Sequence, residues 1–262
     1  MRPNRLRQLL DSGQPTFGTH VHAVWPPVIE VLGHSGQFDY VEVVAEYTSA
    51  TLADLENLCR TAELYDLGTM LKIDQAAQDY WAQRGVGGGF QSILFTDVRT
   101  AEDAAECVRI VRAEFPEDGG THGVKATRMS YVIHAGTPEY VQALRDVVVA
   151  VMIEKKSAVD QLEDILAVPG IDMIQWGPSD YSMSIGKPGQ GSSEEVRAVE
   201  RHVFETALRM GVPPRAEIRG VADAQRFLDV GVCHFSLGTD LMILHQYWQS
   251  EGKALRDLVT GI

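Results

Sequence analysis

The sequence has few cysteines, few basic residues for its length and no long apolar run, and each shortage excludes a class of protein. Its three cysteines, Cys59, Cys107 and Cys233, are odd in number and widely spaced, so we expect reduced structural thiols in a cytoplasmic protein. Lys and Arg number 23 against 36 Asp and Glu, and the formal charge of −13 disfavours nucleic acid and anionic membranes as partners. The basic start lacks the apolar core of a signal peptide, and no run of about 18 apolar residues predicts a membrane span.

What the 262 residues do contain is typical of a globular protein. Hydrophobic residues make up 45% and charged residues 23%, and this composition implies no disorder. The length suits one large α/β barrel, so we expect a single domain over residues 1–262.

Short β-rich segments alternate along the chain with amphipathic stretches of helical spacing. Helical spacing is clearest in 51–66, 99–115 and 193–210. The expected strands are 16–23, 40–46, 68–74, 90–96, 147–154, 171–177, 212–218 and 233–239. Eight strand–helix units predict an α/β fold of the closed (β/α)8 type, a TIM barrel. An open doubly wound sheet is the rival, but its Gly-rich turn is missing, since the glycines of 85–90 precede a strand.

Residues 116–146 break this alternation. They are rich in Gly and polar residues and form a long connection between the fourth and fifth strands. Long loops in compact domains are usually functional or disordered. We expect either a cover over the active site or a contact between subunits.

Active sites of such barrels lie at the C-terminal ends of the strands, and here those ends are strongly polar. The residues in question are His20, His22, Glu46, Tyr47, Lys72, Asp74, Thr96, Asp97, Glu154, Asp180, Glu217, Thr239 and Asp240. Trp25, Phe95 and Trp176 are candidates to line a pocket there, although aromatic residues at strand ends are more often part of the core.

Glu154 and Asp180 stand out because each follows a fully apolar strand. Buried carboxylates are costly unless paired or bound to a metal, and two of them from neighbouring strands suit Mg²⁺ or Mn²⁺. Structural roles compete with this interpretation. Ser179 or Asp180 is a good helix N-cap. Glu154 can pair with Lys155 or Lys156, or it can be a glutamate in the first turn of a helix, where the helix dipole favours it.

Lys72 and the pair His20 and His22 leave several roles open. Lys72 can act as an electrophile toward an enolate oxygen, as a Schiff-base nucleophile, or as a rim lysine paired with Asp74. The two histidines share one face of the first strand. They suit a general base, metal ligands or hydrogen-bonded wall residues.

Several motifs occur in a fixed order and carry a family resemblance. They are GQFDYVEVVAEYTSA (36–50), Lys72, SILFTDVRTAEDA (92–104), MIEKKSAVDQLEDILAVPGID (152–172) and GPSDYSMSIGKPGQ (177–190). Over nearly the whole chain this pattern resembles the class II, metal-dependent pyruvate aldolases of the HpcH/HpaI aldolase/citrate lyase family.

The resemblance implies a TIM barrel of the phosphoenolpyruvate/pyruvate-binding type and assigns several roles. Glu154 and Asp180 become the ligands of a divalent metal, Mg²⁺ or Mn²⁺ with Co²⁺ as a further candidate. The segment Trp176, Gly177, Pro178 and Ser179 becomes the cradle for the carboxylate of pyruvate. The family also implies a homo-oligomer, a hexamer or trimer, in which the C-terminal helix packs on a neighbouring subunit.

Two departures from the family pattern concern proton transfer and charge. Lys72 stands where the family has an arginine. The family's D-G-E-H reads Val44-Ala45-Glu46-Tyr47 here, so Tyr47 replaces the proton-transfer histidine. The task then falls to Tyr47, His20, His22 or a metal-bound water, with Glu46 and His22 as further candidate site residues.

We therefore expect a metal-dependent carbon–carbon lyase that acts on a 2-oxo acid and an aldehyde. The alternatives are a Schiff-base aldolase using Lys72, a 2-oxo acid decarboxylase, and a non-catalytic protein that binds a metal and an oxo acid.

Overall fold

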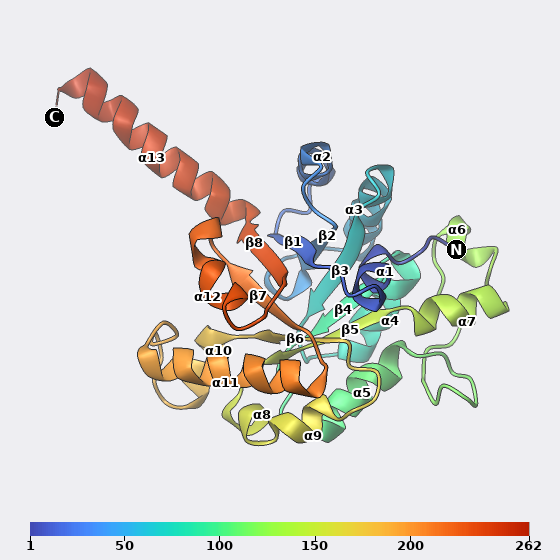
Figure 1. Cartoon of the computed structure of the whole chain (residues 1–262). Coiled ribbons are helices and arrows are strands. Elements are labelled where there is room, and N and C mark those ends of the chain that lie inside the picture. The colour runs from blue at the N-terminus through green and yellow to red at the C-terminus, as the bar shows by residue number, and fades with distance from the viewer. Residues whose placement is uncertain (262) are drawn as a thin grey trace.

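Eight parallel strands close into a barrel in sequence order in the computed structural model, which describes residues 1–261 (Figure 1). The strands are β1 (Thr16–Val21), β2 (Tyr40–Val44), β3 (Gly68–Ile73), β4 (Ser92–Phe95), β5 (Val148–Ile153), β6 (Met173–Trp176), β7 (Pro214–Ile218) and β8 (His234–Thr239). Strand β1 pairs with both β2 and β8, so the ring has no edge. The predicted TIM barrel is confirmed.

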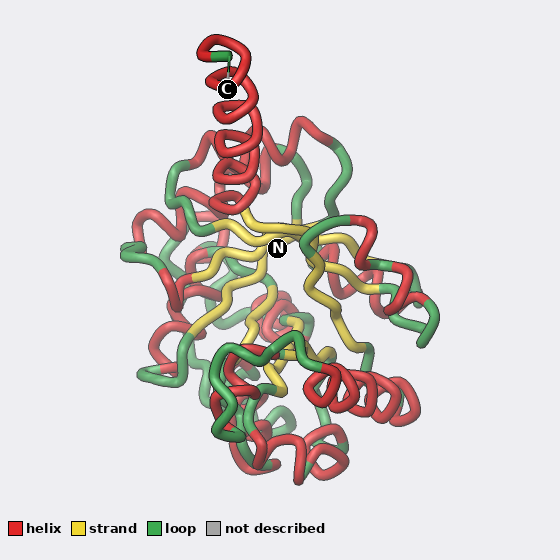
Figure 2. The backbone as a smooth tube through the Cα atoms, turned by 90° about the vertical axis from the view of Figure 1, so that its left-hand side faces the viewer, coloured by secondary structure: helices red, strands yellow, loops and turns green. Residues whose placement is uncertain are grey.

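Helices surround the barrel, with the strands gathered at its centre (Figure 2). They are α1 (Arg5–Asp11), α2 (Pro26–Ser35), α3 (Leu52–Leu64), α4 (Gln78–Gly88), α5 (Ala101–Val111), α6 (Met129–Val132), α7 (Pro138–Arg145), α8 (Lys156–Asp160), α9 (Leu162–Leu166), α10 (Pro178–Ser184), α11 (Glu194–Met210), α12 (Gln225–Leu228) and α13 (Asp240–Thr260). Two 3₁₀ turns complete the set, η1 (Ala45–Tyr47) and η2 (Val221–Asp223). The three helices expected from spacing are confirmed as α3, α5 and α11.

Local sequence explains where two of these helices begin. Thr51 precedes α3 and Thr100 precedes α5, and each hydroxyl accepts the backbone N–H of an aspartate three residues later. Asp54 and Asp103 return the contact to the cap backbone, which completes a capping box. Such boxes satisfy amide groups that the first turn of a helix leaves free.

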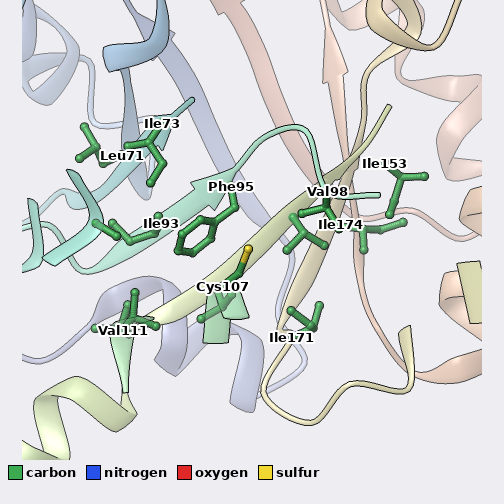
Figure 3. Packing of buried hydrophobic residues seen from close by; sticks show 14 of the residues in the cluster. Leu71, Ile73, Ile93, Phe95, Val98, Cys107, Val111, Ile153, Ile171 and Ile174 are labelled. Carbon is green, nitrogen blue, oxygen red and sulfur yellow. The ribbon is translucent and has the colours of Figure 1, made fainter. Parts of the chain in front are cut away.

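The strands are buried on both faces, and alternate residues belong to two different layers. Leu94 of β4 points into the barrel, where it packs with Tyr40 and Met70. Its neighbours Ile93 and Phe95 belong to the outer layer, and Figure 3 shows them beside Cys107 and Val111 of α5. Both faces of β4 are therefore apolar, as expected for a parallel sheet covered by helices.

Two expected pocket aromatics lie elsewhere. Phe95 is fully buried in the outer layer, because its parity on β4 turns it away from the barrel interior. Trp25 precedes α2 and is 65% exposed, because it sits on a loop outside the last pairing of β1. Only Trp176 of the three lines the cavity described below, so the prediction was wrong for Trp25 and Phe95.

The expected cover over the site, residues 116–146, lies away from it. This stretch folds into α6 and α7 with connecting turns. Its Tyr131 and Tyr140 line a small cavity together with Met1 and Arg2, and within residues 1–261 none of its members lines the large cavity at the strand ends. The idea of an active-site cover was wrong, and the subunit contact stays a prediction.

The structure of residues 1–261 bears on the predictions about free thiols and membrane spans. Cys59, Cys107 and Cys233 are free thiols. Burial raises the pKa of the Cys59 and Cys107 thiols far above its ordinary value, so both remain protonated. No helix within residues 1–261 has the length and apolar character to cross a membrane.

Helix α13 projects from the barrel as a single long rod (Figures 1 and 2). Within residues 1–261 it has no buried residue, and Trp248, Leu255 and Leu258 are among its exposed apolar side chains. A 21-residue helix with this much exposed apolar surface is unusual for an isolated subunit.

Candidate active site

A cavity of about 880 Å³ opens where the strands end. It collects most of the polar side chains predicted from the strand ends. The predicted residues that line it are His20, His22, Tyr47, Lys72, Glu154, Trp176, Gly177, Pro178, Ser179, Asp180, Glu217 and Thr239. Barrel closure thus brings together residues separated by more than half the chain, as the fold predicts.

Glu154 follows β5 and is only 4% exposed. One carboxylate oxygen, Oε1, accepts the backbone N–H of Asp97 at 2.8 Å. Asp97 has φ of 60°, the left-handed region that aspartate tolerates better than most residues. Burial raises the pKa of Glu154 to about 6, and the nearby Asp180 adds to the rise against the opposing charges of Lys72 and Lys155, so the carboxylate is partly protonated in mildly acidic solution.

Gly177 leaves the space that Glu154 occupies. A Cβ atom at this position would lie 2.5 Å from Oε2 of Glu154 and 2.6 Å from its Cβ. Both distances are far below van der Waals contact. Glycine is therefore required at the end of β6 because the carboxylate passes directly over its backbone.

Asp180 lies in the first turn of α10, and it does not cap the helix. The N-cap is Gly177, which has no side chain to accept a hydrogen bond, so the expectation of Ser179 or Asp180 as the cap was wrong. Oδ1 of Asp180 accepts from Nζ of Lys155 at 2.8 Å, and the same ammonium lies 2.6 Å from Oδ1 of Asp97.

The expected pairing of Glu154 with a neighbouring lysine was also wrong. Lys155 joins Asp97 to Asp180, and Lys156 pairs with Asp160 four residues later. The reason is geometric, because adjacent residues at the end of a strand point to opposite sides. Lys155 was missed as a site residue.

Lys72 at the end of β3 is buried beside Glu46 and Tyr47. Nζ lies 2.7 Å from Oε2 of Glu46 and donates to the Tyr47 hydroxyl at 3.3 Å. The expected pairing of Lys72 with Asp74 was wrong, since the turn η1 brings Glu46 closer to the Lys72 amine. Burial alone would lower the pKa of Lys72, but the hydrogen bond with Glu46 and the charges of Glu46, Tyr47 and Glu42 together outweigh burial and raise that pKa. The amine is therefore an ammonium ion at neutral pH.

Tyr47 is a weak base in this setting. Its side chain is 59% exposed. Partial burial of the phenol, together with Glu46, raises the pKa of Tyr47 despite the opposing charge of Lys72. The hydroxyl therefore stays protonated at neutral pH.

His20 and His22 both line the cavity, which agrees with their predicted shared face. His22 lies 3.4 Å from Asp240 and stacks on Tyr47 with 6.3 Å between ring centroids. His20 is 5% exposed and lies between two carboxylates, 3.3 Å from Glu42 and 3.6 Å from Glu217.

A charged pair below His20 was missed from the sequence. Glu42 of β2 and Arg215 of β7 are both fully buried and form an ion pair across the barrel interior. Arg215 also donates to Oε1 of Gln175. The signal in the sequence was a charged residue inside the otherwise apolar strand β2 and a second charged residue, besides Glu217, in β7. Sequence does not tell which face of such a strand points inward.

Glu154 and Asp180 offer the oxygen chemistry that Mg²⁺ or Mn²⁺ prefers. The ionised form of Glu154 lacks a cationic hydrogen-bond partner within residues 1–261, and only Oδ1 of Asp180 is engaged there. No three His, Cys, Asp or Glu side chains in the described chain converge to hold an ion on their own. The pair fits a cation whose remaining ligands are water and substrate oxygens.

Comparison with models of protein families shows to which family the chain belongs. Residues 49–246 match the model of the HpcH/HpaI aldolase/citrate lyase family, which is well over half of the sequence. The chain belongs to the HpcH/HpaI aldolase/citrate lyase family.

Known relatives are distant in sequence and cover the chain almost completely. A 5-keto-4-deoxy-D-glucarate aldolase of Klebsiella pneumoniae subsp. pneumoniae is 27% identical over 254 residues, with 97% of each chain covered. An HpcH/HpaI family protein from Burkholderia cenocepacia J2315 superposes with a TM-score of 0.86 at 25% identity, covering 97% of this chain and 99% of the other. CitE from Mycobacterium tuberculosis, solved with magnesium and pyruvate, shares the fold at a TM-score of 0.54 and 13% identity, covering 85% of this chain and 84% of CitE.

Lys72 and Tyr47, the two positions expected to depart from the family pattern, lie next to each other at the cavity. Their side chains contact each other, with Nζ 4.6 Å from the centre of the tyrosine ring. The position expected to hold a proton-transfer histidine thus holds a phenol bound to an ammonium ion.

Proposed function

We propose that this protein is a carbon–carbon lyase that acts on a 2-oxo acid with a divalent metal held by Glu154 and Asp180. The observation that carries the proposal is the buried Glu154 carboxylate, which faces the same cavity as Asp180 across a glycine that has no room for a Cβ. Within residues 1–261 no lysine or arginine side chain forms a hydrogen bond with Glu154, since Lys155 contacts Asp97 and Asp180 instead, and at Asp180 that contact engages only Oδ1.

The ion would be Mg²⁺ or Mn²⁺, with Co²⁺ as a further candidate. When bound, it supplies Lewis-acid polarisation of the 2-oxo acid. Magnesium in the structure of the distant relative CitE supports this choice.

Lys72 places a fixed positive charge in the wall of the cavity. Because its pKa is raised, it acts here as an electrostatic partner for negative charge that develops on the substrate oxygen. Glu46 holds the ammonium in position at 2.7 Å. Trp176 and the segment Gly177 to Ser179 border the same cavity and flank the substrate carboxylate in this proposal.

The Schiff-base alternative is disfavoured by the same contacts. A lysine nucleophile needs a neutral amine and hence a lowered pKa. The carboxylate of Glu46 has the opposite effect on Lys72.

The test compares carbon–carbon cleavage with and without metal. Purified protein is given oxaloacetate and a panel of 4-hydroxy-2-oxo acids, and pyruvate release is measured by a coupled assay. We expect activity with Mg²⁺ or Mn²⁺, loss of activity after chelation, and loss of metal affinity in Glu154→Gln. Glu205→Gln, an exposed carboxylate of α11 away from the cavity, is the matched control.

Full activity after exhaustive chelation would contradict the proposal. Thermal stabilisation by metal and oxalate without turnover of any substrate in the panel would instead support a non-catalytic binding protein.

The exposed apolar face of α13 supports a homo-oligomer in which this helix packs on a neighbouring subunit. Leu258 is 81% exposed, so Leu258→Glu is harmless to an isolated subunit and dissociates an assembly that buries this residue. Light scattering after gel filtration measures the change, with Glu251→Gln on the same helix as the control. An unchanged monomer in both proteins would contradict the assembly. The cytoplasmic location stays a prediction.

A further inference from the structure

Five side chains form a closed ring of polar contacts at the floor of the cavity, which we call the buried ring because all of its members except Glu217 are buried. Its members are His20, Glu42, Arg215, Gln175 and Glu217. Strand register places His20 directly beside Glu42 and Gln175 directly beside Arg215. Gln175 donates to Oε2 of Glu217 at 3.3 Å, and Oε1 of Glu217 lies 3.6 Å from Nδ1 of His20.

Charges at this depth are exceptional for a barrel of this type. The interior of such barrels is usually filled with branched apolar side chains, whereas Glu42 and Arg215 are 0% exposed here. Removing a charge from water costs several kcal/mol, and a buried ion pair returns that cost only with good geometry. Nε and Nη2 of Arg215 lack hydrogen-bond partners within residues 1–261, so the pair is not optimised for stability alone.

Only two members of the ring reach the cavity, His20 and Glu217. Nε2 of His20 faces Glu42 below, at 3.3 Å, so its other nitrogen, Nδ1, lies on the side of Glu217. A carboxylate beside Nε2 favours the tautomer with its proton on Nε2, so Nδ1 is the nitrogen that accepts a proton, and the Glu217 carboxylate then stabilises the resulting imidazolium. Arg215 in turn holds the Glu42 carboxylate from the opposite strand.

We propose that His20 transfers the substrate proton in this enzyme and that Glu42, anchored by Arg215, is the positioning residue that orients it. This inference rests on the proposed lyase function and deepens it, because it assigns proton transfer to a different strand from the one that Tyr47 follows.

The other candidates facing the cavity are less suited to the task. Lys72 is held as an ammonium ion by Glu46, and Tyr47 keeps its phenolic proton. His22 is bound to Asp240, whose carboxylate also accepts the backbone N–H groups of His22 and Ala23. His20 alone combines an imidazole with a carboxylate on each side.

With pyruvate as substrate, His20 removes a proton from the methyl carbon, C3. Neutral Nδ1 of His20 takes a proton from C3, the C3–H electron pair becomes the C2=C3 double bond, and the carbonyl π pair moves to the C2 oxygen. The imidazolium ion is stabilised by Glu42 and Glu217. Return of a proton from the imidazolium to C3 reverses the electron movements and restores pyruvate. In D₂O the imidazolium N–H first exchanges with solvent, so the particle that returns to C3 is a deuteron.

Charged groups from two strands face His20 and set its pH response. Burial lowers the pKa of His20, but Glu42 of β2 and Glu217 of β7 raise it more, against the opposing charge of Arg215. The net pKa is raised. Because exchange requires the neutral imidazole, the rate should rise with pH, and removing either carboxylate should move its midpoint to lower pH.

The experiment separates proton transfer from carbon–carbon cleavage. Loss of the pyruvate methyl signal in D₂O with Mg²⁺ is followed by proton NMR, and carbon dioxide release from oxaloacetate, which breaks a bond without removing a C–H proton, is measured in parallel. We expect His20→Asn to slow exchange by about 100-fold or more, while carbon dioxide release falls by much less. His234→Asn is the control, since His234 is also a buried strand histidine, 6% exposed, and lies outside the cavity.

Two further variants distinguish positioning from a purely structural role. In Glu42→Gln and Glu217→Gln the exchange midpoint should move to lower pH, and the partly exposed Glu217, at 45%, tolerates replacement without loss of the fold. Unchanged exchange in His20→Asn, or an unmoved midpoint in a folded Glu217→Gln protein, would overturn the inference. If the wild-type protein neither exchanges pyruvate nor decarboxylates oxaloacetate, the proposed function itself fails and this inference falls with it.

Discussion

Replacing Gly177 with alanine should abolish tight metal binding while leaving the barrel folded. The new Cβ would lie 2.5 Å from Oε2 of Glu154 and 3.0 Å from Cε of Met152. The new Cβ would also lie 2.6 Å from Cβ of Glu154. The methionine end can move, but Glu154 must shift as a whole residue by about 1 Å to reach ordinary contact distance. Metal sites require ligand distances within about 0.2 Å of their ideal values, so Glu154 would no longer reach an ion held by Asp180.

The size of the effect follows from linkage. A metal at 100 times its Kd stabilises the folded state by about 2.7 kcal/mol. In a domain of this length that is on the order of 5 to 10 °C in Tm. If Gly177→Ala weakens binding about 100-fold, the same metal concentration contributes only about 0.4 kcal/mol, or roughly 1 °C.

Thermal unfolding with and without Mg²⁺ or Mn²⁺ measures this difference. Gly220→Ala is the control, because it lies beyond the end of β7, has extended backbone with φ of −163°, and has open space around a new Cβ. A metal-induced rise in Tm that is the same in Gly177→Ala as in wild type would refute the reasoning.

Three other predictions follow from the contacts around the cavity. Borohydride with pyruvate should leave no adduct on Lys72 at neutral pH, because Glu46 keeps the amine protonated, and a mass shift on that lysine would refute this. Glu42→Gln should lower the free energy of unfolding, measured in urea, by about 3 to 5 kcal/mol, since it leaves the buried charge of Arg215 without its partner. The double variant Glu42→Met with Arg215→Met should recover most of this loss. With metal removed by a chelator, the pKa of Glu154 in the folded protein is raised to about 6, so the folded state binds a proton that the unfolded state releases. Protonation of Glu154 therefore stabilises the fold below about pH 4.5, and this stabilisation is lost as pH rises through 6. The loss is on the order of 2 kcal/mol relative to Glu154→Gln, saturating metal should remove it, and denaturant melts across this pH range measure it.

The site was only partly accessible from sequence. Glu154 could be picked out from the sequence because it directly follows β5, a strand with no polar residue. Glu42 was missed, because it lies within β2, where every residue is buried and all the others are apolar. The inward face of such a strand is set by how the barrel closes, and hence by contacts with residues far away in the chain.

The sequence by itself determined the eight alternating units, the polar ends of their strands and the carboxylates of Glu154 and Asp180, because these depend on local periodicity. Only the tertiary structure decided that Lys155 joins Asp97 to Asp180, that Gly177 makes room for Glu154, and that the buried ring forms at the floor of the cavity. These contacts depend on the angle and register at which distant strands meet, and the closed barrel fixes both at once.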